Sequence, residues 1–142
     1  MSQVDLKTAL EFALRERLAV LSTVSPSHEP EAALMGIAVT PDFEIIFDCV
    51  KTARKYPNLR DNPKVAFVIG CISEISIQYE GIAEELAGDE LEKYLQIYFT
   101  ALPDAQDRRN RPGGVTYFVV RPKWLRYCDY SQRPPSRTEF TF

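Results

Sequence analysis

The chain has 142 residues, of which 45% are hydrophobic, 11% aromatic and 26% charged, and its formal net charge is −3. This length is typical of one domain, and this composition excludes a disordered or fibrous protein. No apolar run approaches the roughly 18 residues of a membrane-spanning helix, and the N-terminus lacks the pattern of a signal peptide. We therefore expect a cytoplasmic protein without a membrane partner.

The first half of the chain predicts one helix, three strands and a short helix. Apolar residues at helical spacing predict an N-terminal helix within residues 1–17, for which Asp5 is a suitable N-cap. The polar segment 52–63 predicts one or two helical turns that end at Asn62-Pro63, because the residue before a proline disfavours helix. Apolar runs separated by turns that contain proline predict an antiparallel meander. Its strands are expected at residues 18–24, 32–40 and 44–50.

The second half predicts further strands around one amphipathic helix. Apolar residues that share one face predict a helix at 88–99, and a loop at 101–114 follows it. At Gly81 the alternation of apolar residues changes phase, as it does at a β-bulge. The tail 131–142 is expected to be extended and available to a partner subunit. The strands are expected at residues 64–70, 74–86, 115–122 and 123–130, the last two separate or joined as one bent strand.

Together these elements predict a mainly β fold in a single domain that covers residues 1–142. Six or seven short antiparallel strands with few helices form a barrel more readily than an open parallel sheet. We therefore expect an antiparallel β-barrel with flanking helices.

Cysteine and histidine residues are few and widely spaced. Cys49, Cys71 and Cys128 suit a reducing compartment better than a disulfide framework, and they offer no close pair for zinc. A hydrolase with a histidine base would have to use His28, the only histidine, which lies in a predicted turn. The sequence thus predicts no metal site and leaves the catalytic residues unknown.

Charge is unevenly distributed along the chain. Residues 1–107 hold 9 basic and 18 acidic residues, whereas residues 108–142 hold 8 basic and 2 acidic residues. The arginines of the second segment are spread through strand-like sequence and not along a helix, so we do not expect a nucleic-acid partner. A subunit contact or an anionic ligand explains the asymmetry equally well.

The start of the short helix is a candidate phosphate site. Thr52, Arg54 and Lys55 follow a predicted strand directly. A helix N-terminus that adds a hydroxyl, a guanidinium and an ammonium group is a good receptor for a phosphate. A solvated helical turn without a ligand explains the same residues, so the pattern alone leaves both interpretations open.

The wider stretch FDCVKTARKYPNLRDNPKVAFVIG, residues 47–70, resembles the pyridoxamine 5′-phosphate oxidase-like family of flavin-binding split barrels. The family has Ser-Arg-Lys, a leucine and Asn-Pro between two strands, and here Ala53-Arg54-Lys55, Leu59 and Asn62-Pro63 have that order and spacing. Residues 18–39 resemble the family's first hairpin. The chain is most similar to the short members, such as general stress proteins.

The resemblance implies a six-stranded split barrel that forms a homodimer, with FMN at the subunit interface. Arg54 and Lys55 match the family residues that bind the flavin phosphate. Cys49 and Ala53 stand where many members have Thr and Ser, and Thr52 and backbone N–H groups would compensate for the lost hydroxyls.

The flavin ring would lie against a second set of residues that the resemblance assigns. Leu34, Met35 and Gly36 match the strand whose backbone follows the isoalloxazine ring, where Gly36 would allow close approach. Ser76 matches a polar flavin contact on the fifth strand. Trp124 would lie near the flavin or the partner chain, or serve as a core aromatic.

Two departures argue against a true pyridoxamine phosphate oxidase. The tail contains no histidine and so lacks the Arg-x-His element that grips the substrate in those enzymes. Ala33 and Ala38 occupy the region where the family usually has basic phosphate ligands.

Three functions remain open at this point. The first is an FMN-dependent oxidoreductase that passes hydride to or from an unknown small substrate. Reduced nicotinamide is a candidate donor, and because the sequence has no Rossmann fingerprint, the protein would bind it only transiently. The second is a non-catalytic or stress-related protein that binds flavin, deazaflavin or haem, for which His28 is the only candidate imidazole ligand. The third is a barrel without a cofactor that acts as an interaction module.

Overall fold

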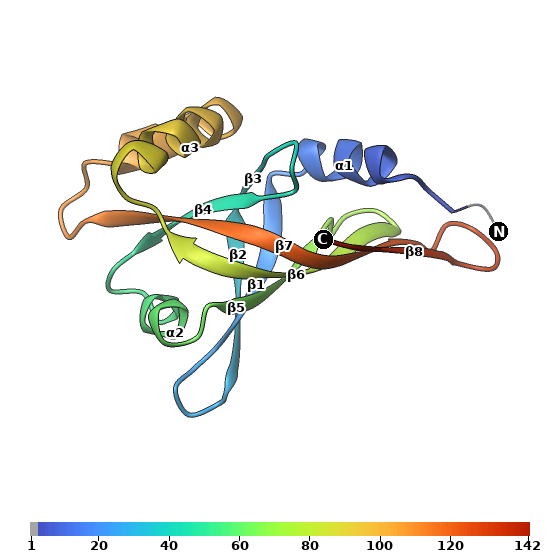
Figure 1. Ribbon diagram of the computed structural model, residues 1–142, viewed down its shortest axis with the longest axis horizontal. Helices are drawn as coiled ribbons and strands as arrows, with labels where there is room; N and C mark the ends of the chain where they lie inside the picture. Colours follow the sequence, from blue (N-terminus) through green and yellow to red (C-terminus); the bar gives the residue numbers. More distant parts are fainter. Residues whose placement is uncertain (1–2) are drawn as a thin grey trace.

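Eight antiparallel strands form one sheet in the computed structural model, which describes residues 3–142. Figure 1 shows this sheet in the middle of the molecule with helices on two sides of it. The strands are β1 (Leu18–Val24), β2 (Pro30–Gly36), β3 (Ala38–Val39), β4 (Ile45–Val50), β5 (Lys64–Ile69), β6 (Ile75–Glu85), β7 (Val115–Asp129) and β8 (Ser136–Thr141).

The strand order curls the sheet back toward itself. The order is β2-β1-β5-β6-β7-β4-β3, and β8 pairs with β7 outside this path. The two ends of the path, β2 and β3, are consecutive in the chain and are separated only by Ile37, whose N–H donates to the Arg17 carbonyl at 2.9 Å. The single strand expected at 32–40 is therefore wrong. The chain breaks at Ile37 because it changes its pairing partner there, from β1 to β4.

Three α-helices and one 3-10 helix flank the sheet: α1 (Leu6–Arg15), α2 (Lys55–Asp61), α3 (Gly88–Ala101) and η1 (Pro103–Arg108). In the view of Figure 1, α1 and α3 lie above the sheet and α2 lies below it. Asp5 caps α1, since its carboxylate accepts a hydrogen bond from the Thr8 backbone N–H at 2.8 Å. η1 occupies part of the segment expected to be a loop, with Pro103 in its first turn. Within residues 3–142, no helix is both long enough and apolar enough to cross a membrane.

Two apolar clusters hold these elements together. The larger one lies on the inner face of the curled sheet, where Phe47 stacks on Phe118 with ring centroids 5.4 Å apart. Phe12 joins α1 to this core through an edge contact with Tyr127. The smaller cluster lies between α3 and the sheet and is centred on Tyr98, which is completely buried.

The bulge expected at Gly81 is confirmed. The register between β6 and β7 shifts between Glu80 and Gly81, so that Glu80 pairs with Trp124 and Gly81 pairs with Pro122. Strand β7 runs through Pro122 without interruption, so the last two strand segments form one strand. A β-bulge bends a strand and increases its twist, which suits the point where a sheet curls.

The C-terminal tail is extended, but it belongs to the sheet of its own chain. Strand β8 pairs with β7, with Thr141 opposite Trp124 at one end and Ser136 opposite Asp129 at the other. The Phe142 ring packs against Phe43 with centroids 5.7 Å apart, and the Phe142 N–H donates to the Lys123 carbonyl at 3.1 Å. The backbone groups of β8 that face β7 are therefore used within the chain, and the sequence pattern gave no sign of this pairing.

Buried tyrosines predict a loss of stability at alkaline pH. Tyr79 is 1% exposed, and burial raises its pKa well above the ordinary value of 10.0; burial also raises the pKa of Tyr98. The fold retains these side chains as neutral phenols, so their contribution is complete well below pH 10 and is lost progressively as the pH rises through 10, where the tyrosines of the unfolded chain ionise. We expect the free energy of unfolding, measured by urea titration, to fall between about pH 9 and about pH 11. The Tyr79→Phe variant should lose less over the same interval, and an equal loss in both proteins would contradict this account.

Candidate functional site

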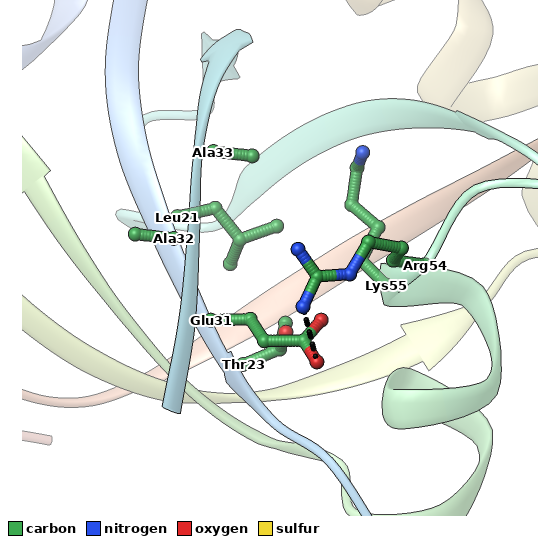
Figure 2. Close-up of a pocket in the computed structure, with 7 residues that line it drawn as sticks. All are labelled: Leu21, Thr23, Glu31, Ala32, Ala33, Arg54 and Lys55. Atoms are coloured by element: carbon green, nitrogen blue, oxygen red, sulfur yellow. Dashed lines mark ion pairs between the residues drawn. The ribbon is translucent and has the colours of Figure 1, made fainter. Parts of the chain in front are cut away.

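A pocket of about 280 Å³ lies between the hairpin β1–β2 and the start of α2. Figure 2 shows its seven lining residues, with Arg54 reaching toward the hairpin and Lys55 pointing away from Glu31. The lining residues are Leu21, Thr23, Glu31, Ala32, Ala33, Arg54 and Lys55.

The hairpin places polar and small side chains at this pocket by strand alternation. Leu21 pairs with Ala33, and Thr23 pairs with Glu31, so these four residues share the inner face of β1 and β2. Leu21 and Thr23 are buried, whereas the exposed side chain of Leu34 lies on the opposite face. The hairpin therefore turns a hydroxyl and a carboxylate toward α2.

Helix α2 places the cations opposite the hairpin. A turn leads from β4 to Arg54, the N-cap residue of α2. This turn is closed by a hydrogen bond of 3.0 Å from the Ala53 N–H to the Val50 carbonyl. Asn58 and Leu59 are buried and anchor the helix. Because the anchors lie one turn into the helix, Arg54 and Lys55 remain at its free end beside the pocket.

A hydrogen-bond network crosses the pocket floor. The Asn58 side-chain amide donates to Thr23 Oγ1 at 3.1 Å and to Glu31 Oε1 at 2.9 Å. The other carboxylate oxygen of Glu31 forms an ion pair with Arg54 at 3.0 Å, drawn as the dashed line in Figure 2. Among the lining residues the charges are those of Arg54, Lys55 and Glu31, which leaves the pocket with an excess of one positive charge.

Two of the ten residues assigned from the sequence, Arg54 and Lys55, line this pocket. Thr52 is exposed, and Ala53 is half-buried and packs against the larger core. Cys49 is 2% exposed, and its thiol donates to the Val50 carbonyl at 3.4 Å. Burial raises the pKa of the Cys49 thiol, so it is a poor source of thiolate.

The β2 residues assigned to the flavin ring lie at one end of that strand. Leu34 is 64% exposed, while Met35 is buried in the larger core. A side chain at Gly36 would meet Leu102 Cδ1 at 3.4 Å, which is an ordinary contact. The packing of this chain by itself therefore does not require glycine at position 36.

Ser76 and Trp124 lie elsewhere on the sheet. Ser76 pairs with Cys128, and Trp124 pairs with Glu80, on the face of β6 and β7 opposite to the buried Tyr79. Trp124 is half-buried, and the Arg126 guanidinium lies 5.3 Å from its ring centroid. Neither residue lines the pocket that contains Arg54 and Lys55.

Sequence reasoning missed Thr23, Glu31 and Asn58. Each is a polar residue at a position that faces the core of the protein, and Thr23 and Asn58 are only 2% exposed. The alternation along β2 could have identified Glu31, because this residue lies on the same inward face as Ala33 and Met35. Asn58 carried no such signal, since α2 has only seven residues.

The sequence and the fold both have known relatives. Over residues 6–129 the sequence matches the family described as pyridoxamine 5′-phosphate oxidase. No curated protein matches the chain significantly. A pyridoxamine 5′-phosphate oxidase-related, FMN-binding protein from Nostoc punctiforme is 12% identical with a TM-score of 0.71, over 100% of this chain and 99% of that one.

Two further structures share this fold. A haem-binding protein from Mycobacterium smegmatis has a TM-score of 0.83 at 17% identity, over 99% of this chain and 59% of that one. General stress protein 26 from Bacillus anthracis has a TM-score of 0.70 at 19% identity, over 94% of this chain and 97% of that one. This chain thus spans 59% of the length of the Mycobacterium smegmatis protein. At these identities the similarity establishes the fold.

These comparisons agree with the curled antiparallel sheet and its flanking helices, and they confirm the expected fold class and family resemblance. The sheet has eight strands and not the six or seven expected, because the chain breaks at Ile37 and the tail forms β8. Because the family match covers residues 6–129, it includes both the hairpin and α2, which form the pocket. The chain belongs to the pyridoxamine 5′-phosphate oxidase-like family of split barrels.

Proposed function

We propose that this protein is an FMN-binding flavoprotein, and that it acts as an oxidoreductase on a small substrate. The observation that carries this proposal is the pair of cations, Arg54 and Lys55, on the lining of one pocket. The sequence resemblance to the family implies that these two residues bind the flavin phosphate. The donor set suits the phosphate end of FMN. The pocket lining holds two cations and one carboxylate, and the Thr23 hydroxyl, which accepts from Asn58, retains its own proton for donation.

Each residue has a distinct part in binding. Arg54 offers a planar fork of N–H donors for two phosphate oxygens, and Lys55 adds a compact charge. Leu21 and Ala33 supply an apolar wall beside these charges. Bound FMN would supply hydride transfer, so the protein needs to bind and orient it and need not provide an acid or base of its own.

The outer face of the sheet supports a homodimer as part of this proposal. The register aligns Leu34, Val20 and Val68 in one row across β2, β1 and β5, and the row continues through Gln78 and Arg126. Leu34 and Val68 are 64% and 42% exposed. A second copy that covers this apolar half would bury both side chains. Reduced nicotinamide is the proposed transient donor.

The test is a visible absorption spectrum of the purified protein, repeated after incubation with FMN and gel filtration. We expect oxidised-flavin bands that remain with the protein at the mass of a dimer. Oxidation of reduced nicotinamide by this complex would then distinguish an oxidoreductase from a flavin carrier. A protein that emerges colourless after saturation with FMN would overturn the proposal.

Haem is the second candidate, because the structure from Mycobacterium smegmatis with a TM-score of 0.83 is a haem-binding protein. His28 is exposed in the turn between β1 and β2, with φ of 66°, and it does not line the pocket described above. Haem binding by this chain would therefore use His28 at the hairpin tip or a ligand other than imidazole. A Soret band after haem addition that is lost in His28→Ala would favour this candidate over FMN.

A further inference from the structure

Glu31 is a fixed anion inside the pocket. Its side chain is 19% exposed and accepts a hydrogen bond from Asn58 at 2.9 Å. Asn58 is itself 2% exposed and is held by a second bond to the buried Thr23. Since Asn58 cannot turn without breaking both bonds, the Glu31 carboxylate is held in place from behind.

Arg54 is the solvent-exposed member of the ion pair that Glu31 forms. The Arg54 side chain is 82% exposed and contacts the Glu31 carboxylate at 3.0 Å from the solvent side. A long exposed side chain exchanges partners more easily than a buried, hydrogen-bonded one. The pocket therefore contains an anion, Glu31, that is already paired with one of its two cations, Arg54.

A phosphate that enters the pocket must share Arg54 with Glu31. A phosphate monoester carries nearly two negative charges at neutral pH, because its second pKa is about 6. The lining charges sum to only one positive charge, so a dianion leaves the filled pocket with an excess of negative charge. Repulsion between the fixed carboxylate and the phosphate acts across a partly desolvated space, where screening is weaker than in water.

We propose that Glu31 is a specificity-determining residue that weakens the preference of this pocket for doubly charged phosphate. This inference rests on the proposed function. Glu31 acts as an internal counter-anion: it neutralises Arg54 in the empty pocket and competes with the ligand phosphate for it. Consequently the protein discriminates between a flavin with a phosphate and one without it far less than its two cations alone would allow.

The test compares FMN with riboflavin, which differs only by the phosphate. In Glu31→Gln the amide oxygen still accepts from Asn58, but the competing charge is gone. At pH 7.5 we expect the ratio of FMN affinity to riboflavin affinity, measured by flavin fluorescence quenching, to rise at least tenfold. Glu11→Gln removes the same charge from an exposed position on α1 and should leave the ratio unchanged. An affinity ratio that stays constant or falls in Glu31→Gln would overturn the proposal. A fall would mean that Glu31 instead orients Arg54 for the phosphate.

A titration with inorganic phosphate separates this inference from the proposed function. Thermal-shift measurements should give a Kd for phosphate that is at least tenfold lower in Glu31→Gln than in the unmodified protein, and no such gain in Glu11→Gln. If neither flavin binds any variant, the flavoprotein proposal fails, while the phosphate titration still decides the role of Glu31. Equal phosphate affinities in all three proteins would overturn that role.

Discussion

Replacing Arg54 and Lys55 together with alanine is expected to weaken FMN binding by more than about tenfold. A hydrogen bond to a charged group contributes about 1.5–3 kcal/mol, and the double variant removes the two charged donors of the pocket. The exposure of Arg54 reduces its share, because solvent screens an exposed charge. Equilibrium titration of flavin fluorescence at constant salt measures the effect.

The matched control also removes two positive charges close to the pocket. Lys51 and Arg60 are exposed residues that flank the same segment but do not line the pocket, so Lys51→Ala with Arg60→Ala should leave FMN affinity nearly unchanged. Riboflavin affinity should be the same in both double variants. Unchanged FMN affinity in the Arg54 and Lys55 variant would remove these residues from the phosphate site.

Replacing Gly81 with alanine is expected to lower the free energy of unfolding by roughly 2–3 kcal/mol, a typical cost of overpacking a filled core. An added Cβ would lie 2.6 Å from the Arg121 carbonyl oxygen and 2.7 Å from Val120 Cγ1. The Arg121 carbonyl belongs to β7, which is paired on both sides of the bulge, so it cannot move without disturbing the ladder. Urea denaturation of the purified variant measures the loss.

Gly36 provides the control for this substitution. It also lies in a strand, but its added Cβ would lie 3.4 Å from the flexible end of Leu102 and 4.0 Å from the Arg17 carbonyl oxygen, both ordinary contacts. Gly36→Ala should therefore change the free energy of unfolding by less than about 1 kcal/mol, and the lower entropy of the unfolded chain favours a small gain. Equal losses in the two variants would show that the crowding at Gly81 is not the cause.

Local patterns were sufficient to predict most elements of this protein. Strand β1 begins and ends where the apolar run 18–24 does, and β4, β5, β6 and α3 lie within two residues of their expected bounds. The phase change at Gly81 predicted the bulge, because alternation within a strand reports directly on which side is buried. Arg54 and Lys55 were identified because they are adjacent in sequence and match a family motif.

The features that no local pattern predicted depend on which strands pair. The break at Ile37 and the pairing of β8 with β7 cannot be predicted from the residues of those segments alone, because both depend on which partner strands the curled sheet offers. Strand pairing joins residues far apart in the chain, and its cost and gain depend on the whole topology.

The amino-acid sequence by itself therefore determined the family, the order of the strands along the chain and the cations of the pocket. The tertiary structure decided what those cations face. Thr23, Glu31 and Asn58 come from β1, β2 and α2, and only the folded chain brings them within hydrogen-bond distance. A sequence motif specifies which charges a site contains, whereas the balance among them depends on distances and burial that arise only when distant segments pack together.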